Sequence, residues 1–300
     1  MDIETLRRQF GGDDLDFVYA GEGLIKAVIH TRAASAEVYL HGATVTHWQP
    51  VDQPQPVLFL SEHSFLKPDK PIRGGVPICW PWFGPHPTDS RQPQHGLVRA
   101  RAWRLASVQT LDAARTRLKF EIEVPGASAA FTLTVGPTLQ MSLKSRNEGD
   151  QPLRVEEALH TYLTVGDSQS VHITGLEGQE YIDKTAGGAR RRQGAAQPVR
   201  FTGETDRIYL NSETTCVLHD PVLKRRISVH KTGSRSTVVW NPWIDKSRAL
   251  SDFGDDEWTR MCCIESANAA DNALMLSPKK GEHETTVQIE VDGSEASSIA

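Results

Sequence analysis

Apolar and polar residues alternate along much of the chain in short runs that are separated by turn-forming residues. The runs include LIKAVIH, AEVYL, ATVTHW, RLKFEIEV, AFTLTV, LQMSLKS, TCVLHD, RISVHK, STVVWN and TTVQIEV. A two-residue period points successive side chains to opposite faces of a strand, and such runs bounded by turns are typical of antiparallel sheets. Helical periodicity is scarce and predicts only a helix over Ile3 to Phe10 and a helical turn around Ser247 to Phe253. The pattern therefore predicts an all-β sandwich or barrel-like fold.

The segment from Pro71 to Trp103 breaks this alternation. Its glycines and prolines disfavour a regular helix or strand, and glycine also permits a positive φ or a close approach of backbone to a ligand. Arg73 and Arg99 lie beside glycines in this segment, and two such cations suit an anion. The segment also holds the aromatic residues Trp80, Trp82 and Phe83. Two interpretations stand: a binding site whose aromatic faces suit a sugar ring, or a surface loop whose aromatic side chains fill the core.

A second irregular segment runs from Thr185 to Pro198, with the sequence TAGGARRRQGAAQP. Its glycine and alanine content predicts a mobile surface excursion rather than a packed element, with the arginines Arg190, Arg191 and Arg192 in solvent. Residues 293–300, GSEASSIA, have the composition of a frayed chain end.

Composition narrows the classes of function. The 300 residues carry a net charge of -5 without the basic footprint that nucleic-acid binding needs, so a small anion is the expected partner of the arginines. The N-terminus lacks a signal-peptide core, and no run approaches the roughly 20 apolar residues of a membrane span. We therefore expect a cytoplasmic protein without a membrane partner, and the sequence leaves its oligomeric state open, a monomer included. The four cysteines predict reduced structural thiols rather than a disulfide framework: Cys79, Cys216, Cys262 and Cys263.

Two titratable residues stand among apolar neighbours. His160, in EEALHTYLTV, is expected to be at least half buried; on a concave face it would suit proton transfer near neutral pH, and otherwise it is a core histidine bonded to a backbone carbonyl. Glu265 follows the apolar run Met261 to Ile264, where desolvation would make it a better base; the alternative is a strand-end glutamate facing water. The acidic turn suits helix capping or solvation rather than proton transfer: Asp252, Asp255, Asp256 and Glu257.

Other kinds of site lack their motifs. The eleven histidines include no His-Glu-x-x-His spacing. His41 and His47 lie too far apart in an extended strand to share an ion, so we expect no metal site. The Gly-x-Ser-x-Gly motif and the phosphate loops of ATP-binding and dinucleotide-binding proteins are missing. We therefore expect no cofactor.

Several longer motifs follow one another from about His41 to Ala269. They are HGATVTHWQP, FLSEHSFLKPDKPIRGGVPICWPWFGP, PQHGLVRARAW, EEALHTYLTVGD, ETDRIYLN, VVWNPW, DFGDDEW and CIESANA. In these motifs the chain resembles the glucose-6-phosphate 1-epimerase, or hexose-6-phosphate mutarotase, branch of the aldose 1-epimerase family. The resemblance covers nearly the whole chain and implies a single domain over residues 1–300. It also implies the galactose mutarotase-like fold, a large antiparallel β-sandwich (supersandwich) with its site on a concave face.

The resemblance further implies a set of site residues. His160 in HTY and Glu265 in CIES match the catalytic histidine and glutamate of the family. The positions that match contacts to the sugar phosphate are Arg73 of PIRGG, Gln94 and Arg99 of QHGLVR, and Asp206 of ETDRIY. His95 is expected to line the same pocket.

The implied reaction is the interconversion of the α and β anomers of D-glucose 6-phosphate without cofactor or metal. Glu265 would remove the proton of the anomeric hydroxyl while His160 protonates the ring oxygen, and the roles would be exchanged in ring closure after rotation about the C1–C2 bond. Arg73 and Arg99 would hold the phosphate through charge-assisted bonds. The sequence leaves open which other hexose 6-phosphates are accepted.

Two other functions use the same residues differently. A carbohydrate-binding β-sandwich without catalysis would use the tryptophans as stacking platforms and would not need His160 or Glu265. An aldose 1-epimerase acting on unphosphorylated sugars would not need the pair of Arg73 and Arg99.

Overall fold

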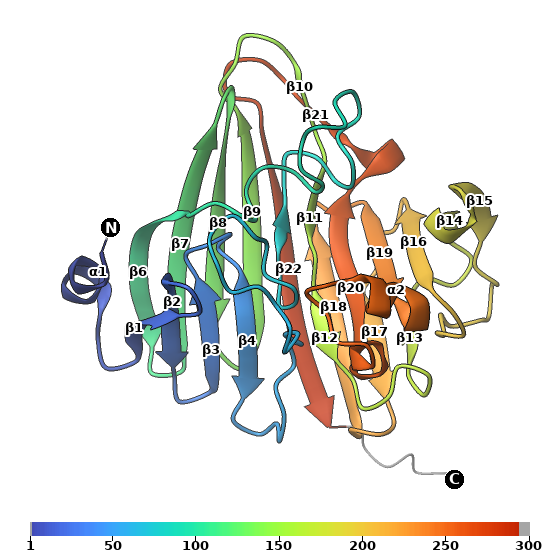
Figure 1. Ribbon diagram of the computed structural model, residues 1–300, viewed down its shortest axis with the longest axis horizontal. Coiled ribbons are helices and arrows are strands. Elements are labelled where there is room, and N and C mark those ends of the chain that lie inside the picture. The colour runs from blue at the N-terminus through green and yellow to red at the C-terminus, as the bar shows by residue number, and fades with distance from the viewer. Residues whose placement is uncertain (1, 294–300) are drawn as a thin grey trace.

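The fold consists of two large antiparallel sheets and two smaller ones (Figure 1). The computed structural model describes residues 2–293, so the predicted frayed end lies outside the described residues apart from Gly293. All strand pairs in these sheets are antiparallel. The predicted all-β sandwich is confirmed.

One eight-stranded sheet, called here the long-strand sheet, contains the longest strands of the chain. Its order is β13 (His172–Thr174), β17 (Cys216–Asp220), β18 (Arg225–Thr232), β22 (Glu282–Gly293), β9 (Leu139–Asn147), β8 (Ala127–Val135), β7 (Arg115–Val124) and β6 (Arg104–Asp112). The last strand of the chain, β22, therefore lies in the middle of the sheet, between β18 and β9.

The other eight-stranded sheet, called here the short-strand sheet, has the order β15 (Ala189–Arg192), β14 (Glu180–Asp183), β16 (Thr205–Leu210), β19 (Ser236–Asn241), β20 (Met261–Asn268), β11 (Glu157–Leu159) and β5 (Ile78–Cys79). Strand β12 (Tyr162–Thr164) also pairs with β20, beyond the end of β11. The centre of this sheet thus combines segments far apart in sequence.

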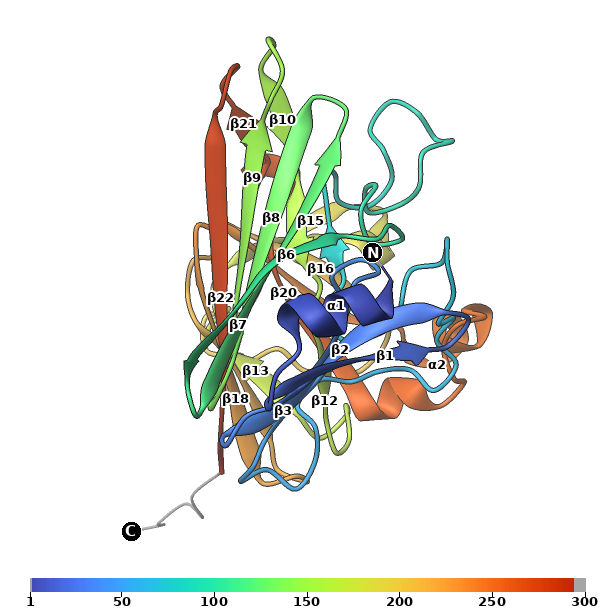
Figure 2. The same cartoon turned by 90° about the vertical axis from the view of Figure 1, so that its left-hand side faces the viewer.

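The smaller sheets lie beside these two. The four-stranded sheet contains β1 (Leu15–Ala20), β2 (Leu24–His30), β3 (Ala34–Tyr39) and β4 (Val45–Pro50), and the two-stranded one contains β10 (Leu153–Val155) and β21 (Leu274–Leu276). Figure 2 shows the four-stranded sheet and α1 (Ile3–Phe10) on one side of the long strands. The remaining helical elements are short: η1 (Lys184–Ala186), α2 (Trp243–Ala249), η2 (Glu257–Arg260) and η3 (Ala270–Asn272).

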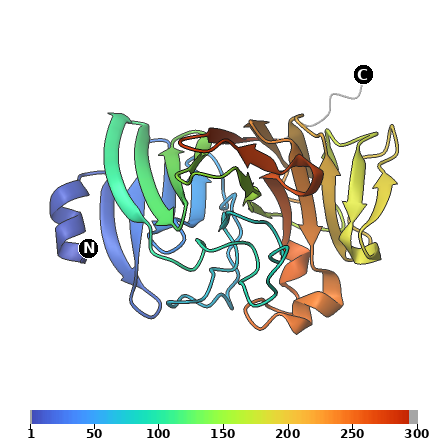
Figure 3. The same cartoon turned by 90° about the horizontal axis from the view of Figure 1, so that it is seen from above.

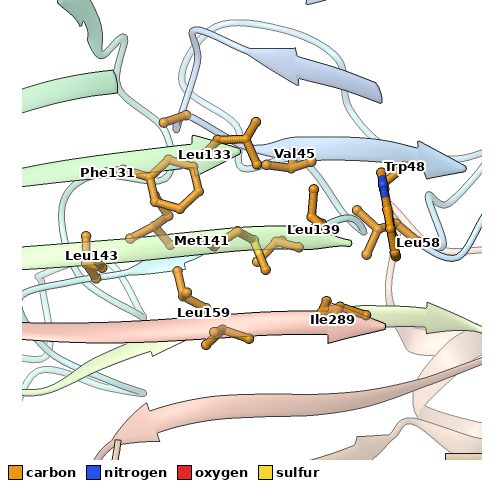
Figure 4. Close-up of a cluster of buried hydrophobic side chains, with 14 of the residues drawn as sticks. Val45, Trp48, Leu58, Phe131, Leu133, Leu139, Met141, Leu143, Leu159 and Ile289 are labelled. Atoms are coloured by element: carbon orange, nitrogen blue, oxygen red, sulfur yellow. The ribbon is translucent and has the colours of Figure 1, made fainter. Parts of the chain in front are cut away.

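A continuous hydrophobic core joins the sheets. Along β7, buried Leu118 and Phe120 alternate with more exposed residues, as a strand with one buried face requires. Figure 4 shows core side chains of the long-strand sheet gathered with those of β4 and β11; they include Phe131, Leu133, Met141, Ile289, Val45, Trp48 and Leu159. Each large apolar side chain buried in this way contributes about 1.5–3 kcal/mol.

Strand β20 is buried along its whole length, and both of its faces are covered. Cys262 and Ile264 belong to the core, whereas Cys263 and Glu265 alternate with them and face the other side. Figure 3 shows what covers that side: the irregular segment before β6, in cyan to teal, runs along the same side of the molecule as α2. A carboxylate in the middle of β20 is therefore enclosed.

The helix predictions are partly confirmed. The helix over Ile3 to Phe10 is present as α1, and the side chain of Asp2 caps it by accepting a bond from the backbone N–H of Thr5 at 2.9 Å. The predicted turn around Ser247 to Phe253 is present, with backbone bonds from Leu250 to Ser247 and from Phe253 to Leu250. The helix before it, α2, begins earlier than expected, at Trp243. Among residues 2–293, no helix is long and apolar enough to cross a bilayer.

The prediction of a mobile excursion over Thr185 to Pro198 was wrong. This segment contains η1 and the strand β15, which pairs along its length with β14. Arg190 contributes to its order through ion pairs with Glu180 and Asp271. The three consecutive arginines are exposed, as predicted.

Candidate active site

A cavity of about 380 Å³ lies on the covered face of the short-strand sheet. The seven residues predicted for the site all line it: Arg73, Gln94, His95, Arg99, His160, Asp206 and Glu265. They come from the segment Pro71 to Trp103, from the junction of β11 and β12, from β16 and from β20. The fold thus brings residues nearly 200 positions apart to one place.

His160 and Glu265 face each other because of strand register. Both β11 and β12 pair with β20, with Leu159 opposite Ser266 and Tyr162 opposite Cys263. Continuing that register across the short break between β11 and β12 places His160 opposite Glu265. Their Nε2 and Oε1 atoms lie 3.3 Å apart.

The environment of this pair favours uncharged forms. His160 is 8% exposed and Glu265 is 1% exposed. Burial raises the pKa of Glu265 well above its ordinary value, and Asp206 adds to the shift. Burial lowers the pKa of His160 well below its ordinary value, with Arg99 and Arg73 acting in the same direction. Each residue also keeps a buried atom without a protein partner, Nδ1 of His160 and Oε2 of Glu265. The pair therefore has both a labile proton and unused hydrogen-bonding capacity.

Arg73 is already matched by a carboxylate. Its guanidinium contacts both oxygens of Asp252 at 3.2 Å and donates to the hydroxyl of Tyr162 at 3.2 Å. Burial opposes the charge, but Tyr162 and Asp252 outweigh burial and raise the pKa of Arg73. The expectation that Asp252 serves capping or solvation was wrong, because its side chain is buried against this cation.

Arg99 has a different environment. Its Nη2 donates to the backbone carbonyl of Gln94 at 2.9 Å, and among residues 2–293 it makes no ion pair with a carboxylate. Burial lowers the pKa of Arg99, which reflects the cost of keeping its charge there. Arg99 is thus a partly buried cation with hydrogen-bond donors to spare.

Two lysines complete the polar wall of the cavity. Lys184, in η1, lies 3.4 Å from Asp206 and stands over the ring of Phe83 at 5.7 Å. Lys246, in α2, pairs with Glu204 at 2.8 Å. Three of the four cations that line the cavity therefore have an acidic partner each, and the charge left over is that of Arg99.

The aromatic residues of the irregular segment divide between core and cavity. Trp80 belongs to the core and donates to the hydroxyl of Ser145 at 3.0 Å, and Trp82 donates to the carbonyl of Pro93 at 3.0 Å. Phe83 lines the cavity, and Trp240 of β19 does so as well. Trp80 thus fills the core, as one interpretation expects, and Phe83 is the aromatic residue of this segment that faces the cavity.

The glycines of the segment serve backbone packing. Gly75 and Gly96 have positive φ angles of 65° and 86°. A Cβ atom would lie 2.1 Å from the carbonyl oxygen of Val45 at Gly75, and 1.9 Å from that of Trp80 at Gly96. The close approach that these glycines permit is therefore made to the backbone of neighbouring segments.

One group in the described part of the chain has the arrangement of metal ligands. Donor atoms of His160, Cys263 and Glu265 lie within 4.8 Å of one another. The positive charges of Arg99 and Lys184 act on Glu265 in the same cavity, and they disfavour a further cation. The cavity is thus better suited to an anion than to a metal ion.

The four cysteines are buried free thiols, as predicted.

A larger groove, of about 700 Å³, lies elsewhere, between α1, β2 and residues 100–105. Leucine, isoleucine and alanine side chains make up much of its lining, and none of the seven predicted site residues is among them. The smaller cavity, which the predicted site residues line, is therefore the candidate active site.

Comparison with known proteins identifies the family of this chain. The profile of the aldose 1-epimerase family matches residues 26–289. The chain belongs to the aldose 1-epimerase family. Members of this family interconvert sugar anomers, so the predictions of the family and of an epimerase reaction are confirmed.

Individual relatives span nearly the whole chain. A protein from Cenchrus ciliaris, provisionally named glucose-6-phosphate 1-epimerase, is 35% identical over 282 residues, which are 88% of this chain and 84% of the relative. The crystal structure of a protein from Salmonella typhimurium, provisionally described as a mutarotase, superposes with a TM-score of 0.85 at 29% identity and covers 95% of this chain and 96% of its own. A galactose mutarotase-like protein from Clostridium acetobutylicum shares the fold, with a TM-score of 0.65 at 11% identity over 94% of this chain and all of its own. The predicted fold family is confirmed.

Several residues of the site were missed by sequence reasoning: Tyr162, Lys184, Trp240, Lys246 and Asp252. Tyr162 was available from strand alternation, because it lies two residues after His160. Trp240 is aligned with Cys263 only by strand register, which the sequence does not show. The lysines carried no comparable signal, since each lies in a short helical element whose position over the cavity depends on the tertiary fold.

Proposed function

We propose that this epimerase acts on D-glucose 6-phosphate and related hexose 6-phosphates, with Glu265 and His160 as its proton carriers. Relatives that bear the provisional name glucose-6-phosphate 1-epimerase support the substrate class. The observation that carries the proposal is the unmatched charge of Arg99 in the cavity that holds the proton-transfer pair. A phosphate dianion supplies the partner that this cation lacks.

The phosphate contacts follow from the charges of the cavity. Arg99 supplies the main charge-assisted bonds, and Arg73, which keeps Asp252 as its partner, contributes at the same end. Gln94 and His95 are polar groups on the adjoining loop. Asp206, held by Lys184, is placed to accept a bond from a sugar hydroxyl. Trp240 and Phe83 offer apolar faces to the C–H groups of the ring.

Ring opening requires one proton to leave the anomeric hydroxyl and one to reach the ring oxygen. The two oxygens are bonded to the same carbon, so two proton carriers 3.3 Å apart can reach both. Glu265 accepts the proton of the hydroxyl as a carboxylate, and the imidazolium of His160 protonates the ring oxygen as the C1–O5 bond breaks. The pair then consists of a carboxylic acid and a neutral imidazole, and the sugar is an open-chain aldehyde.

Ring closure reverses these transfers. Rotation about C1–C2 presents the other face of the carbonyl. The C5 hydroxyl then attacks C1 and gives its proton to His160, while Glu265 returns its proton to the former carbonyl oxygen. The number of protons on the pair is conserved. Burial helps the first half of the reaction, because opening turns a charged pair into the neutral one that the cavity favours. A bound phosphate offsets the cations that lower the pKa of His160 and so favours the charged form before opening.

The test is anomer exchange measured by NMR exchange spectroscopy on glucose 6-phosphate and on glucose, with wild type, His160→Gln and Glu265→Gln. Positioned proton transfer contributes about 10²- to 10⁴-fold in rate, so each variant is expected to lose at least 100-fold in kcat. Exchange at the wild-type rate in either variant would overturn the assignment of that residue as a proton carrier.

The variant Arg99→Met tests the proposed contact between Arg99 and the phosphate. We expect kcat/KM for glucose 6-phosphate to fall by about 10- to 100-fold, from a charged hydrogen bond of about 1.5–3 kcal/mol. Exchange of glucose should change by less than about threefold. An equal loss with both sugars would contradict the phosphate role and favour an aldose 1-epimerase that acts on unphosphorylated sugars.

A further inference from the structure

Glu156 lies just before β11, outside the cavity, and its carboxylate gathers three donors. Its Oε1 accepts from Arg154 Nη2 at 2.9 Å and from the backbone N–H of Ala270 at 3.0 Å, and its Oε2 accepts from the backbone N–H of Phe83 at 3.2 Å. The backbone N–H of Glu156 also donates to the carbonyl of Pro81 at 2.9 Å. Glu156 is 8% exposed. Glu156 thus holds the turn at Pro81 to Phe83 through hydrogen bonds of both its backbone and its side chain.

The next residue of that turn, Gly84, holds His95. The backbone N–H of Gly84 donates to Nδ1 of His95 at 3.3 Å, and the carbonyl of Gly84 accepts from the backbone N–H of His95 at 2.7 Å. The ring of Phe83 meets the ring of His95 edge to face, with centroids 4.9 Å apart. Residues 83 and 84 therefore fix both the position and the plane of this imidazole.

The acceptor role of Nδ1 decides where the proton of His95 resides. A neutral imidazole has one N–H and one lone pair, so a ring nitrogen that accepts a backbone N–H leaves the proton on the other nitrogen. Nε2 of His95 is then a donor, on a ring that lines the cavity with its centroid 6.0 Å from that of His160. Burial, followed by the cations Arg99 and Lys184, lowers the pKa of His95 well below its ordinary value, in keeping with a neutral ring.

We propose that Glu156 is a positioning residue for the epimerase reaction: through the turn at Phe83 and Gly84 it fixes His95 as a neutral donor whose Nε2–H points at a sugar oxygen. The inference rests on the proposed function only for the nature of the ligand. The hydrogen bond at one ring nitrogen of a histidine sets the role of the other nitrogen, and at metal sites loss of such an outer partner typically costs about 10–100-fold. Glu156 acts on His95 from outside the set of residues that line the cavity.

A double-mutant cycle between Glu156→Gln and His95→Gln tests this on activity. If Glu156 acts through His95, Glu156→Gln should lower kcat/KM by about 5- to 50-fold in the wild-type background and by less than about twofold when His95 is already glutamine. The sugar used is whichever one the wild type turns over. Equal losses in both backgrounds would overturn the proposal.

Asp220→Asn is the matched control for a buried carboxylate that holds backbone. Asp220 is 2% exposed and accepts from the backbone N–H groups of Gly166, Val222 and Leu223, away from the cavity. This variant should lower the thermal midpoint, as Glu156→Gln should, and its effect on kcat/KM should be the same with and without His95. Coupling of His95 to Asp220 as strong as to Glu156 would mean that the cycle reports general loosening, and it would overturn the proposal.

A second measurement does not depend on activity. Two-bond ¹H–¹⁵N spectra of histidine-labelled protein, with His95 assigned by its loss in His95→Gln, should show a protonated Nε2 and an unprotonated Nδ1. In Glu156→Gln the Nδ1 resonance should move, because the N–H that it accepts has shifted, and in Asp220→Asn it should stay. A protonated Nδ1 in the wild type, or an unmoved Nδ1 in Glu156→Gln, would overturn the inference even if the protein is a glucose-6-phosphate 1-epimerase. Failure of that function alone would leave these spectra unchanged.

Discussion

The imidazole of His160 lies flat against the phenol ring of Tyr162, with centroids 4.7 Å apart and an angle of 14° between the planes. The hydroxyl of the same tyrosine accepts from Arg73. Tyr162 thus connects the proposed proton donor to the cation and carboxylate pair behind it. Its ring restrains the plane of His160, while its hydroxyl helps to satisfy Arg73.

Two substitutions of Tyr162 separate these contributions. Tyr162→Phe keeps the stacked ring and removes one acceptor, so kcat should fall by less than about tenfold, in line with a net hydrogen bond of about 1 kcal/mol. Tyr162→Ala also removes the ring support, and we expect a loss of kcat above 100-fold together with about 3–5 kcal/mol of stability. The checks are kcat from NMR exchange and urea unfolding. A larger kcat loss for the phenylalanine variant than for the alanine variant would contradict the stacking role.

Asp252→Asn should separate binding from stability. The substitution leaves the half-buried Arg73 without its carboxylate, at a cost of about 1–3 kcal/mol in the free energy of unfolding. The same change frees the charge of Arg73 for a phosphate, so KM for glucose 6-phosphate should fall. Asp255→Asn, at an exposed position of the same turn, is the control and should change neither quantity. A raised KM in Asp252→Asn would mean that Asp252 orients Arg73 rather than competing for it.

Glu265 and the two cavity histidines should shape the pH dependence of stability in opposite ways. The folded-state pKa of Glu265 is raised, mainly by burial, so its contribution is full below its unfolded pKa and is lost as pH rises toward its folded pKa. Burial lowers the folded-state pKa values of His95 and His160, so their contribution is present above about pH 6.5 and is lost as pH falls.

The variant Glu265→Gln isolates the carboxyl. Between about pH 6.5 and 8 the wild type should lose stability relative to this variant, because only the wild type has a carboxyl that ionises on unfolding. Urea midpoints at several pH values across this window measure the difference. Parallel curves for the two proteins would show that Glu265 is already ionised in the folded state.

Gly96→Ala tests the close backbone packing behind the cavity. A Cβ at this position would lie 1.9 Å from the carbonyl oxygen of Trp80, so the chain must move in addition to bearing a left-handed φ. Gly84→Ala is the matched control, since its φ is 73° and nothing lies within 4 Å of the added Cβ. We expect about 1–2 kcal/mol of destabilisation for the control, from backbone strain, and clearly more for Gly96→Ala, measured by urea unfolding. Equal losses would show that the packing adds nothing to the strain.

The long strands were accessible from sequence because one buried face imposes a two-residue period, as along β7 and β9. The centre of the short-strand sheet was harder, because β20 is buried on both faces and β11 and β12 have three residues each. Strands that are buried on both faces or are only three residues long show no alternation of apolar and polar residues. Register nevertheless explains afterwards why His160 meets Glu265.

The candidate site could be named from motifs, but its charge balance could not. Which cations have partners depends on contacts such as Arg73 with Asp252, 179 positions apart, and Lys184 with Asp206, which the pairing of β14 with β16 brings together. The prediction for β15 failed for the same reason, because the glycine-rich composition is visible in the sequence and the ion pairs of Arg190 are not. Tertiary ion pairs leave no local pattern in a sequence.

The place of β20 in its sheet has a consequence for how the cavity opens. Glu265 is carried by a strand bonded on one side to β19 and on the other to β11 and β12, so its backbone amide is expected to exchange with solvent only when the whole protein unfolds. The loop over residues 85–94, which ends at Gln94 on the other wall, is exposed and held by few backbone hydrogen bonds, so its amides are expected to exchange by local opening. The two walls of the cavity are therefore expected to open at different free energies: the loop by local opening, and the strand that carries Glu265 only with global unfolding.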